Sequence, residues 1–259
     1  MCTYGRFTCV ERAMNCFLAQ THPNKELIIY NTDAENPFTD PECRLGPLGI
    51  LIVNNGTDME TRLPYTNVGA IRRDALRFAS GTHVVTWDDD DIFLPHFMAQ
   101  AAHRMSETGL PAFKPARSFF YSGDFLRLVM NTMEASVVAS IEKVRQYGYH
   151  LETGKEGLAW YTALRDAREI DEHDYQCVPS YCFNWNDGGE MLAPHKQSGD
   201  INNPENFENH KRASTDRVGG RSLSIWDVEK MGETYRPYLE FIKAHSGDFP
   251  PGLVERYGL

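Results

Sequence analysis

The stretch Thr82–Pro95, THVVTWDDDDIFLP, decides how the rest of the chain is interpreted. Val84–Trp87 are β-branched or aromatic, which is typical of a buried strand, and four consecutive aspartates, Asp88–Asp91, follow at once. Adjacent carboxylates repel one another, and a hard divalent cation such as Mg²⁺ or Mn²⁺ relieves that repulsion because it prefers oxygen ligands. The alternative interpretation is a solvated acidic turn, because aspartate is common in loops.

The order of these aspartates indicates which of them would bind a cation. Side chains alternate along an extended backbone, so Asp88 and Asp90 would point to one side and Asp89 and Asp91 to the other. The carboxyl end of a strand is also where open α/β sheets bind ligands. The sequence therefore predicts that one Asp-x-Asp pair of this run, either Asp88 with Asp90 or Asp89 with Asp91, holds a metal ion.

Length and composition describe an ordinary globular protein. The chain has 259 residues, of which 41% are hydrophobic and 24% charged, enough for one domain with a full core. The net charge of −10 argues against a broad nucleic-acid surface, although the basic residues within Lys211–Arg221 leave a local one open. No apolar run reaches the roughly 18–20 residues that span a bilayer. Six scattered cysteines suggest reduced thiols, and hence a cytoplasmic protein.

The hydrophobic periodicity predicts alternating strands and helices. A capping box, Thr8 with Glu11, would start the first helix. The succession of strands and helices up to residue 95 predicts an α/β fold with a mostly parallel sheet. The expected strands are 26–30, 48–53, 82–87, 113–121, 135–139 and 175–183, and the expected helices are 8–21, 67–80, 95–107, 140–147, 157–165 and 224–245.

Five segments in the same order resemble the inverting family 2 glycosyltransferases of the GT-A fold. Thr3–Arg6, TYGR, is similar to the family's P-T-Y-N-R, and Leu18–Asn24, LAQTHPN, to its L-x-Q-T-Y-P-N. Glu26–Asp33, ELIIYNTD, resembles E-I-I-V-V-D-D-G, and Asn67–Ala75 resembles N-x-G-x-x-x-A-R-N. Gly81–Pro95 is similar to G-x-x-I-x-x-L-D-A-D-D-x-x-x-P. The resemblance covers about the first hundred residues.

This resemblance implies a fold and its division. The fold would be the Rossmann-like GT-A sandwich of nucleotide-diphospho-sugar transferases, with a mostly parallel central sheet. Residues 1–110 would form the nucleotide-sugar-binding half of a single domain. Residues 111–259 would form the acceptor-binding half, with a late loop at 187–221 and a C-terminal helix. The family has a strand before its T-Y-N-R segment, so the first strand is expected to be truncated here.

The resemblance also implies a set of site residues. Asp88, Asp90 and the late-loop His195 would bind Mn²⁺ or Mg²⁺, which would bridge the two phosphates of the donor. Asp33 or Asn31 would face the nucleoside, with a residue that stabilises a turn as the alternative, which suits Asn31 equally well. Arg72 or Arg73 would bind a phosphate, with a surface ion pair as the alternative. The residues expected to contact the nucleotide sugar are Thr3, Tyr4, Arg6, Asn31, Asp33, Asn67, Arg72, Arg73, Asp88 and Asp89.

An inverting transferase also needs a carboxylate that accepts the proton of the acceptor hydroxyl. The family takes it from a Glu-Asp pair at the start of a helix, and here that pair is Glu156-Gly157. Glu156 is therefore the candidate base, and glycine stands where aspartate is usual. The alternative for Glu156 is an acid favoured by the helix dipole. Asp74 replaces the family's usual asparagine and is expected to weaken a contact to the diphosphate.

The function implied is metal-dependent, inverting transfer of a sugar from a nucleotide donor to a hydroxyl. The donor would be UDP-linked, and the acceptor a glycan, a lipid-linked saccharide or a modified DNA base. An alternative is a catalytically inactive protein of the same fold that binds nucleotide sugars. A phosphoryl-transfer enzyme is disfavoured, because the chain has no G-x-x-x-x-G-K-[ST] run.

Overall fold

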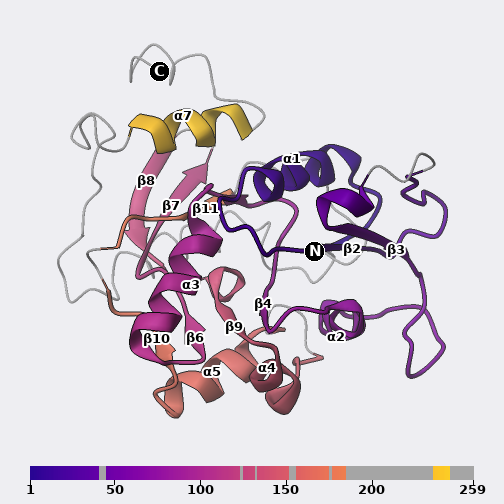
Figure 1. Ribbon diagram of the computed structural model, residues 1–259. Helices are drawn as coiled ribbons and strands as arrows, with labels where there is room; N and C mark the ends of the chain where they lie inside the picture. Colours follow the sequence, from indigo (N-terminus) through magenta and orange to yellow (C-terminus); the bar gives the residue numbers. More distant parts are fainter. Residues whose placement is uncertain are drawn as a thin grey trace. The chain divides into compact units, whose positions relative to one another are not determined.

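A computed structural model describes residues 1–40, 45–122, 125–131, 133–151, 156–174, 177–184 and 236–245 (Figure 1). The chain divides into two compact units, which are described separately below. The first unit comprises Met1–Asp89, Pro95–Lys114 and Met133–Glu172. The second comprises Asp90–Leu94, Pro115–Thr132 and His173–Leu259. The two halves expected at 1–110 and 111–259 therefore do not coincide with these units, and the roles of those halves remain predictions.

The described elements alternate between strands and helices. The strands are β1 (Cys2–Thr3), β2 (Leu27–Asn31), β3 (Ile50–Asn54), β4 (His83–Val85), β5 (Ile92–Phe93), β6 (Ala112–Phe113), β7 (Arg117–Ser122), β8 (Phe125–Met130), β9 (Val138–Ser140), β10 (Ile170–Asp171) and β11 (Tyr181–Asn184). The helices are α1 (Phe7–Leu18), α2 (Val68–Ala75), α3 (Phe97–Thr108), α4 (Ile141–Tyr147), α5 (Leu158–Asp166) and α7 (Arg236–His245). Short 3₁₀ helices are η1 (Gly46–Leu48), η2 (Leu76–Phe78) and η3 (Glu134–Ser136).

The first sheet is parallel, in the order β1-β2-β3, with α1 on one face and α2 on the other (Figure 1). The amphipathic pattern of α1 explains its place, because Cys9, Ala13, Cys16 and Phe17 share one face and are buried. β2 is a continuous apolar run in which Leu27, Ile29 and Tyr30 are buried, as is typical of a parallel strand covered on both faces. The polar residues at the end of β2 and just after it therefore lie at the carboxyl edge of this sheet.

The second sheet, also in the first unit, has the order β10-β6-β9-β4. Its strands are mixed, because β9 runs antiparallel to both β4 and β6, while β10 is parallel to β6. A core cluster joins this sheet to α4 and α5 through buried side chains that include Val137, Val144, Trp160 and Leu164. The cluster fixes the start of α5, where Glu156 and Gly157 lie.

The first strand is as short as expected. Cys2 and Thr3 pair with Tyr30 and Asn31, and the amino group of Met1 donates to the carbonyl oxygen of Ile28 at 2.8 Å. A pocket of about 760 Å³ lies beside this strand. Its lining includes residues 25–28, at the beginning of β2, and residues 82–87, which contain β4. The edges of the two sheets thus meet at a pocket instead of at a shared strand.

The second unit contains a third sheet in the order β5-β11-β7-β8. β11 is parallel to β7 and antiparallel to β5, and β7 is antiparallel to β8. Phe93 packs against Tyr181 with ring centroids 5.2 Å apart. This contact fixes the segment that directly follows the four aspartates.

Several predicted boundaries need correction. Helix α1 begins at Phe7, and its N-cap Arg6 makes no side-chain capping bond, so the predicted capping box from Thr8 is wrong. The strand expected at 135–139 is instead η3 followed by β9, and the strand expected at 82–87 is limited to β4. β8 and β10 were not predicted. The late loop at 187–221 and the predicted helical residues 224–235 lie outside the described residues.

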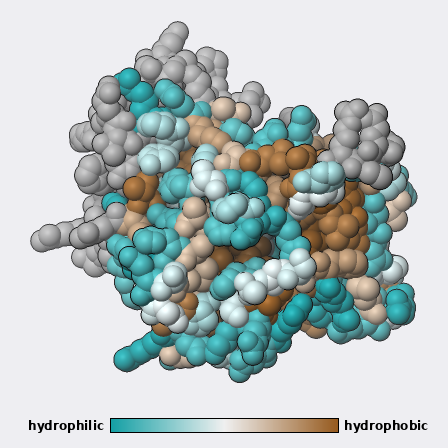
Figure 2. Space-filling model, viewed as in Figure 1, coloured by the Kyte–Doolittle hydropathy of each residue, from teal (hydrophilic) through white to brown (hydrophobic). Residues whose placement is uncertain are grey.

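Some large apolar side chains reach the surface. Phe7, Leu48, Leu51 and Leu63 are exposed, and hydrophobic patches interrupt the hydrophilic surface on the face seen in Figure 2. Among the described residues, no helix has both the length and the hydropathy needed to cross a membrane.

Candidate functional site

The four aspartates lie between β4 and β5, and their burial alternates. Asp89 and Asp91 are only 1% and 2% exposed, whereas Asp88 and Asp90 are half-buried. The alternation arises in a turn, at Asp89 and Asp90, and not on the extended backbone that the sequence predicted. Asp88 and Asp89 belong to the first unit, and Asp90 and Asp91 begin the second.

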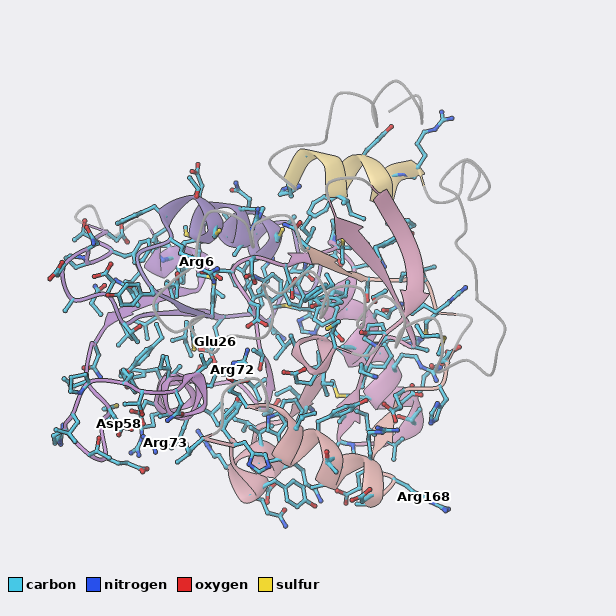
Figure 3. The ribbon with its side chains drawn as sticks, turned by 180° about the vertical axis from the view of Figure 1, so that it is seen from behind. Arg6, Glu26, Asp58, Arg72, Arg73 and Arg168 are labelled. Carbon is cyan, nitrogen blue, oxygen red and sulfur yellow. The ribbon has the colours of Figure 1, made fainter. Side chains whose placement is uncertain are left out.

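Asp89 joins the motif to the N-terminal segment. Its Oδ2 accepts a hydrogen bond from Thr3 Oγ1 at 2.7 Å, and its Oδ1 is paired with Arg6, which precedes α1 (Figure 3). Arg12 donates to its carbonyl oxygen at 3.3 Å. Thr3 and Arg6 are thus both bonded to Asp89, and all three residues were predicted to contact the donor. This arrangement positions the backbone on which Asp88 lies.

Asp91 has a comparable role in the second unit. Its carboxylate accepts from the hydroxyl of Tyr181 and, at 3.0 Å, from the backbone N–H of Asn184. It therefore ties the start of β5 to β11. With Asp89 and Asp91 held by the protein, Asp88 and Asp90 are the two half-exposed carboxylates of the motif.

Arg72 links Asp88 to a carboxylate that the sequence did not single out. Arg72 lies on α2 (Figure 3), and its Nη2 donates to Asp88 Oδ1 at 2.9 Å. Its Nη1 is 4.0 Å from Glu134 Oε1. Burial opposes the charge of Arg72, but Asp88 and Glu134 outweigh it and raise the pKa of Arg72 above its usual value. Within the described residues, Nε and Nη1 of Arg72 are buried and have no hydrogen-bond partner.

Asn31 and Asp33 form a polar turn at the end of β2. Asn31 Oδ1 accepts from the backbone N–H groups of Gly5 and Asp33 at 3.2 and 3.1 Å. Asp33 accepts from the side chain of Asn36 at 2.9 Å, which lowers the pKa of Asp33. Gly5 has a φ of +62°, and a Cβ there would overlap the Asp33 carboxylate. Both side chains stabilise the turn, and their contact with a nucleoside remains a prediction.

Arg73 takes part in an ion-pair network with acids near it. It pairs with Asp58 at 2.9 Å (Figure 3) and with Glu60 at 2.6 Å, and its Nε donates to Asp74 at 3.1 Å. Asp74 is buried and also accepts from the hydroxyl of Tyr65 at 2.7 Å. The aspartate at position 74 is therefore explained by the hydrogen bonds that it accepts within this network. The same acids also neutralise the charge of Arg73 without a bound phosphate.

Asn67 is the N-cap of α2, and its side chain accepts from the N–H of Ala70 at 2.7 Å. We expect Asn67→Ala to lower the free energy of unfolding by about 1 kcal/mol, because the cap is lost, and Asn67→Ser to restore most of it. Urea unfolding measures both. Unchanged stability in Asn67→Ala would contradict the capping role.

Glu156 is buried, with 6% of its surface exposed, and directly precedes Gly157, the N-cap of α5. Its carbonyl oxygen accepts from the N–H of His150 at 3.1 Å. Tyr4 is half-buried in the turn between β1 and α1. His195 lies outside the described residues. No motif marks Glu134, so only the unusual glycine at position 157 could have drawn attention to its surroundings.

A metal site is not complete in the part of the chain that the structure describes. There, no group of three or more His, Cys, Asp or Glu side chains is arranged to hold a metal ion. Mg²⁺ is usually bound by one or two carboxylates together with waters and substrate phosphates, so a third protein ligand is not required. Asp88 and Asp90 therefore remain predicted metal ligands.

Comparison with solved structures identifies the fold. The chain is similar to S. aureus TarS residues 1–349 in complex with UDP, with a TM-score of 0.56 and 14% identity over 95% of this chain and 86% of that one. For the complex of the same protein with UDP-GlcNAc, the TM-score is 0.55 and the identity 14%, over 96% and 80% of the two chains. No protein-family model matches the sequence, and no curated protein matches it significantly. The chain has the GT-A fold of nucleotide-sugar glycosyltransferases.

Proposed function

We propose that the protein transfers a sugar from a nucleoside-diphosphate donor to an acceptor hydroxyl, with inversion at the sugar carbon. The observation that carries this proposal is the pairing of Asp88 with Arg72 directly after β4. In this pair the Asp88 carboxylate is half-buried. The buried Nε and Nη1 atoms of Arg72 have no hydrogen-bond partner among the described residues. A diphosphate is a ligand that such donors bind well. TarS, which shares the fold, is seen with UDP and UDP-GlcNAc, so UDP-linked donors are the first to test.

A divalent cation belongs to this proposal. Asp88 and Asp90 would hold Mn²⁺ or Mg²⁺, because both provide hard oxygen ligands and are half-buried, whereas Asp89 and Asp91 are almost fully buried. When bound, the ion would neutralise the charge that develops on the departing diphosphate. His195 remains a predicted third ligand from the sequence.

The remaining residues divide between binding and support. Arg72 would donate to a donor phosphate, and Thr3 and Arg6 would hold Asp89, and with it Asp88, in place. A carboxylate must take the proton of the acceptor hydroxyl. Glu134 and Glu156 both contribute to the electrostatics of Arg72 and are the candidates in the first unit.

The test is calorimetric titration with UDP, and with GDP for comparison, in the presence and absence of Mn²⁺. We expect UDP binding to require the metal and to weaken at least tenfold, roughly 1.4 kcal/mol, in Asp90→Ala. Glu11→Ala, which removes an exposed carboxylate on α1, is the matched control and should bind like wild type.

Two outcomes would change the conclusion. If folded wild-type protein binds neither nucleotide with Mn²⁺, the proposed function is wrong. If UDP binds but no donor is turned over, the alternative of an inactive nucleotide-sugar-binding protein is favoured, and the glycine at position 157 is the feature that motivates it.

A further inference from the structure

The space beside Gly157 is occupied by another side chain. A Cβ atom at Gly157 would lie 2.5 Å from Cγ, 3.5 Å from Cβ and 3.6 Å from Cδ of Glu134. The backbone of Gly157 has φ −87° and ψ −11°, which any L-residue adopts. The glycine is therefore not required by its own conformation. It is required by the side chain of Glu134, which occupies the place where a side chain from position 157 would begin.

Glu134 brings its carboxylate to the charged groups of the site. Its Oε1 is 4.0 Å from Nη1 of Arg72, the residue that bonds Asp88 at 2.9 Å. The acid sits in η3, immediately before β9, and all these residues belong to the first unit. Burial raises the pKa of Glu134, Arg72 acts to lower it, and Asp88 and Glu156 raise it further. Glu134 is thus an acid in the same electrostatic environment as the proposed donor site.

The two candidate acids, Glu134 and Glu156, differ in how much of their surface is exposed to solvent. The side chain of Glu134 is 25% exposed, whereas Glu156 as a whole is 6% exposed. A base must come within hydrogen-bonding distance of the hydroxyl it deprotonates. Glu134 is therefore the more exposed of the two acids.

We propose that Glu134 is the catalytic base, and that it supplies from another element the carboxylate that position 157 lacks. The inference rests on the proposed function. In the step, the Glu134 carboxylate takes the proton of the acceptor hydroxyl while the oxygen of that hydroxyl bonds to the anomeric carbon. The bond from that carbon to the diphosphate oxygen breaks, and its electron pair leaves with the diphosphate. Glu134 afterwards returns the proton to solvent.

Donor hydrolysis tests the proposal without knowledge of the acceptor, because water takes the place of the hydroxyl. UDP release is measured from UDP-GlcNAc, UDP-glucose and UDP-galactose with Mn²⁺. Since general base catalysis contributes about 10²–10⁴-fold, Glu134→Gln should slow UDP release at least about 100-fold. Its UDP affinity with Mn²⁺, measured by calorimetry, should stay within about twofold of wild type. The matched variant Glu142→Gln, at an exposed acid of α4, should retain UDP release within a few-fold.

A paired substitution tests the shared space directly. Glu134→Ala removes the base and frees the place beside position 157, which an aspartate at 157 would then fill. We expect Glu134→Ala with Gly157→Asp to release UDP at least about tenfold faster than Glu134→Ala alone. Gly157→Asp alone should be impaired, because both side chains compete for one space. Glu134→Ala with Gly157→Asn is the control for packing, because it fills the same space without a carboxylate and should not recover UDP release.

The outcomes distinguish this inference from the proposed function. Wild-type protein that does not bind UDP with Mn²⁺ overturns both. UDP release by Glu134→Gln at the wild-type rate, loss of its UDP binding, or absence of rescue in the double variant overturns the role of Glu134 alone. Wild-type protein that binds UDP but hydrolyses none of the three donors also overturns that role.

Discussion

Gly69→Ala is expected to destabilise the protein by about 3 kcal/mol, at the upper end of the usual cost of overpacking. Gly69 is buried in the first turn of α2, and a Cβ there would overlap the carbonyl oxygen of His150 and lie 2.9 Å from its carbonyl carbon. Backbone atoms cannot rotate out of the way as a flexible side chain can. The helix and the segment at His150 would therefore have to separate.

Urea unfolding of the variant measures this cost. Gly46→Ala in η1 is the matched control, because a Cβ at Gly46 meets nothing within 4 Å. Its stability should stay within about 0.5 kcal/mol of wild type. An unfolding curve of Gly69→Ala that matches wild type would show that α2 and the segment at His150 do not touch.

Asp74→Ala is expected to cost roughly 3–5 kcal/mol, as breaking a buried ion pair does. The carboxylate is fully buried and accepts from Met59 N at 2.8 Å, Tyr65 Oη at 2.7 Å and Arg73 Nε at 3.1 Å. Alanine removes the acceptor that these three donors share, although Arg73 keeps its pairs with Asp58 and Glu60. Urea unfolding at pH 7 measures the loss, and Glu142→Ala, on the exposed surface of α4, is the control.

The same carboxylate makes stability depend on pH. Burial acts to raise the pKa of Asp74, but the bonds from Arg73, Met59 and Tyr65 outweigh it and lower that pKa below 3.8. A lowered carboxyl pKa adds stability above the unfolded value, which is lost as the pH falls through the folded one. Asp74→Asn should therefore show a shallower loss of stability than wild type below about pH 4. Equal acid slopes in the two proteins would contradict this assignment.

The N-terminal half was predictable because its patterns are local. The apolar periodicity of α1, the run of β2 and the aspartates after β4 each signal their structure within a few neighbouring residues. Asp89 shows the limit of such reasoning. Its bonds to Thr3 and Arg6 cross more than eighty positions, so the sequence could suggest that all three belong to one site but not that they bind each other.

Glu134 illustrates the part that could not be predicted. It lies in a short 3₁₀ turn with no motif around it, and its importance comes from its contact with Gly157 in space. The missing aspartate at 157 was visible in the sequence, but its replacement from another element was not. The brief strands β6 and β10, of two residues each, are likewise stabilised by pairing and not by their own composition.

The pocket beside β1 also affects how the protein avoids aggregation. An unpaired strand edge is a template for a strand from another molecule. Among the described strands, β4 is an edge strand of its sheet. β1 pairs only with Tyr30 and Asn31 of β2, so its other edge has no partner strand among them. Both of these incomplete edges line the same pocket. A strand from a neighbouring molecule would have to enter that pocket to pair with them, so these two edges are less accessible than an edge strand on the open surface.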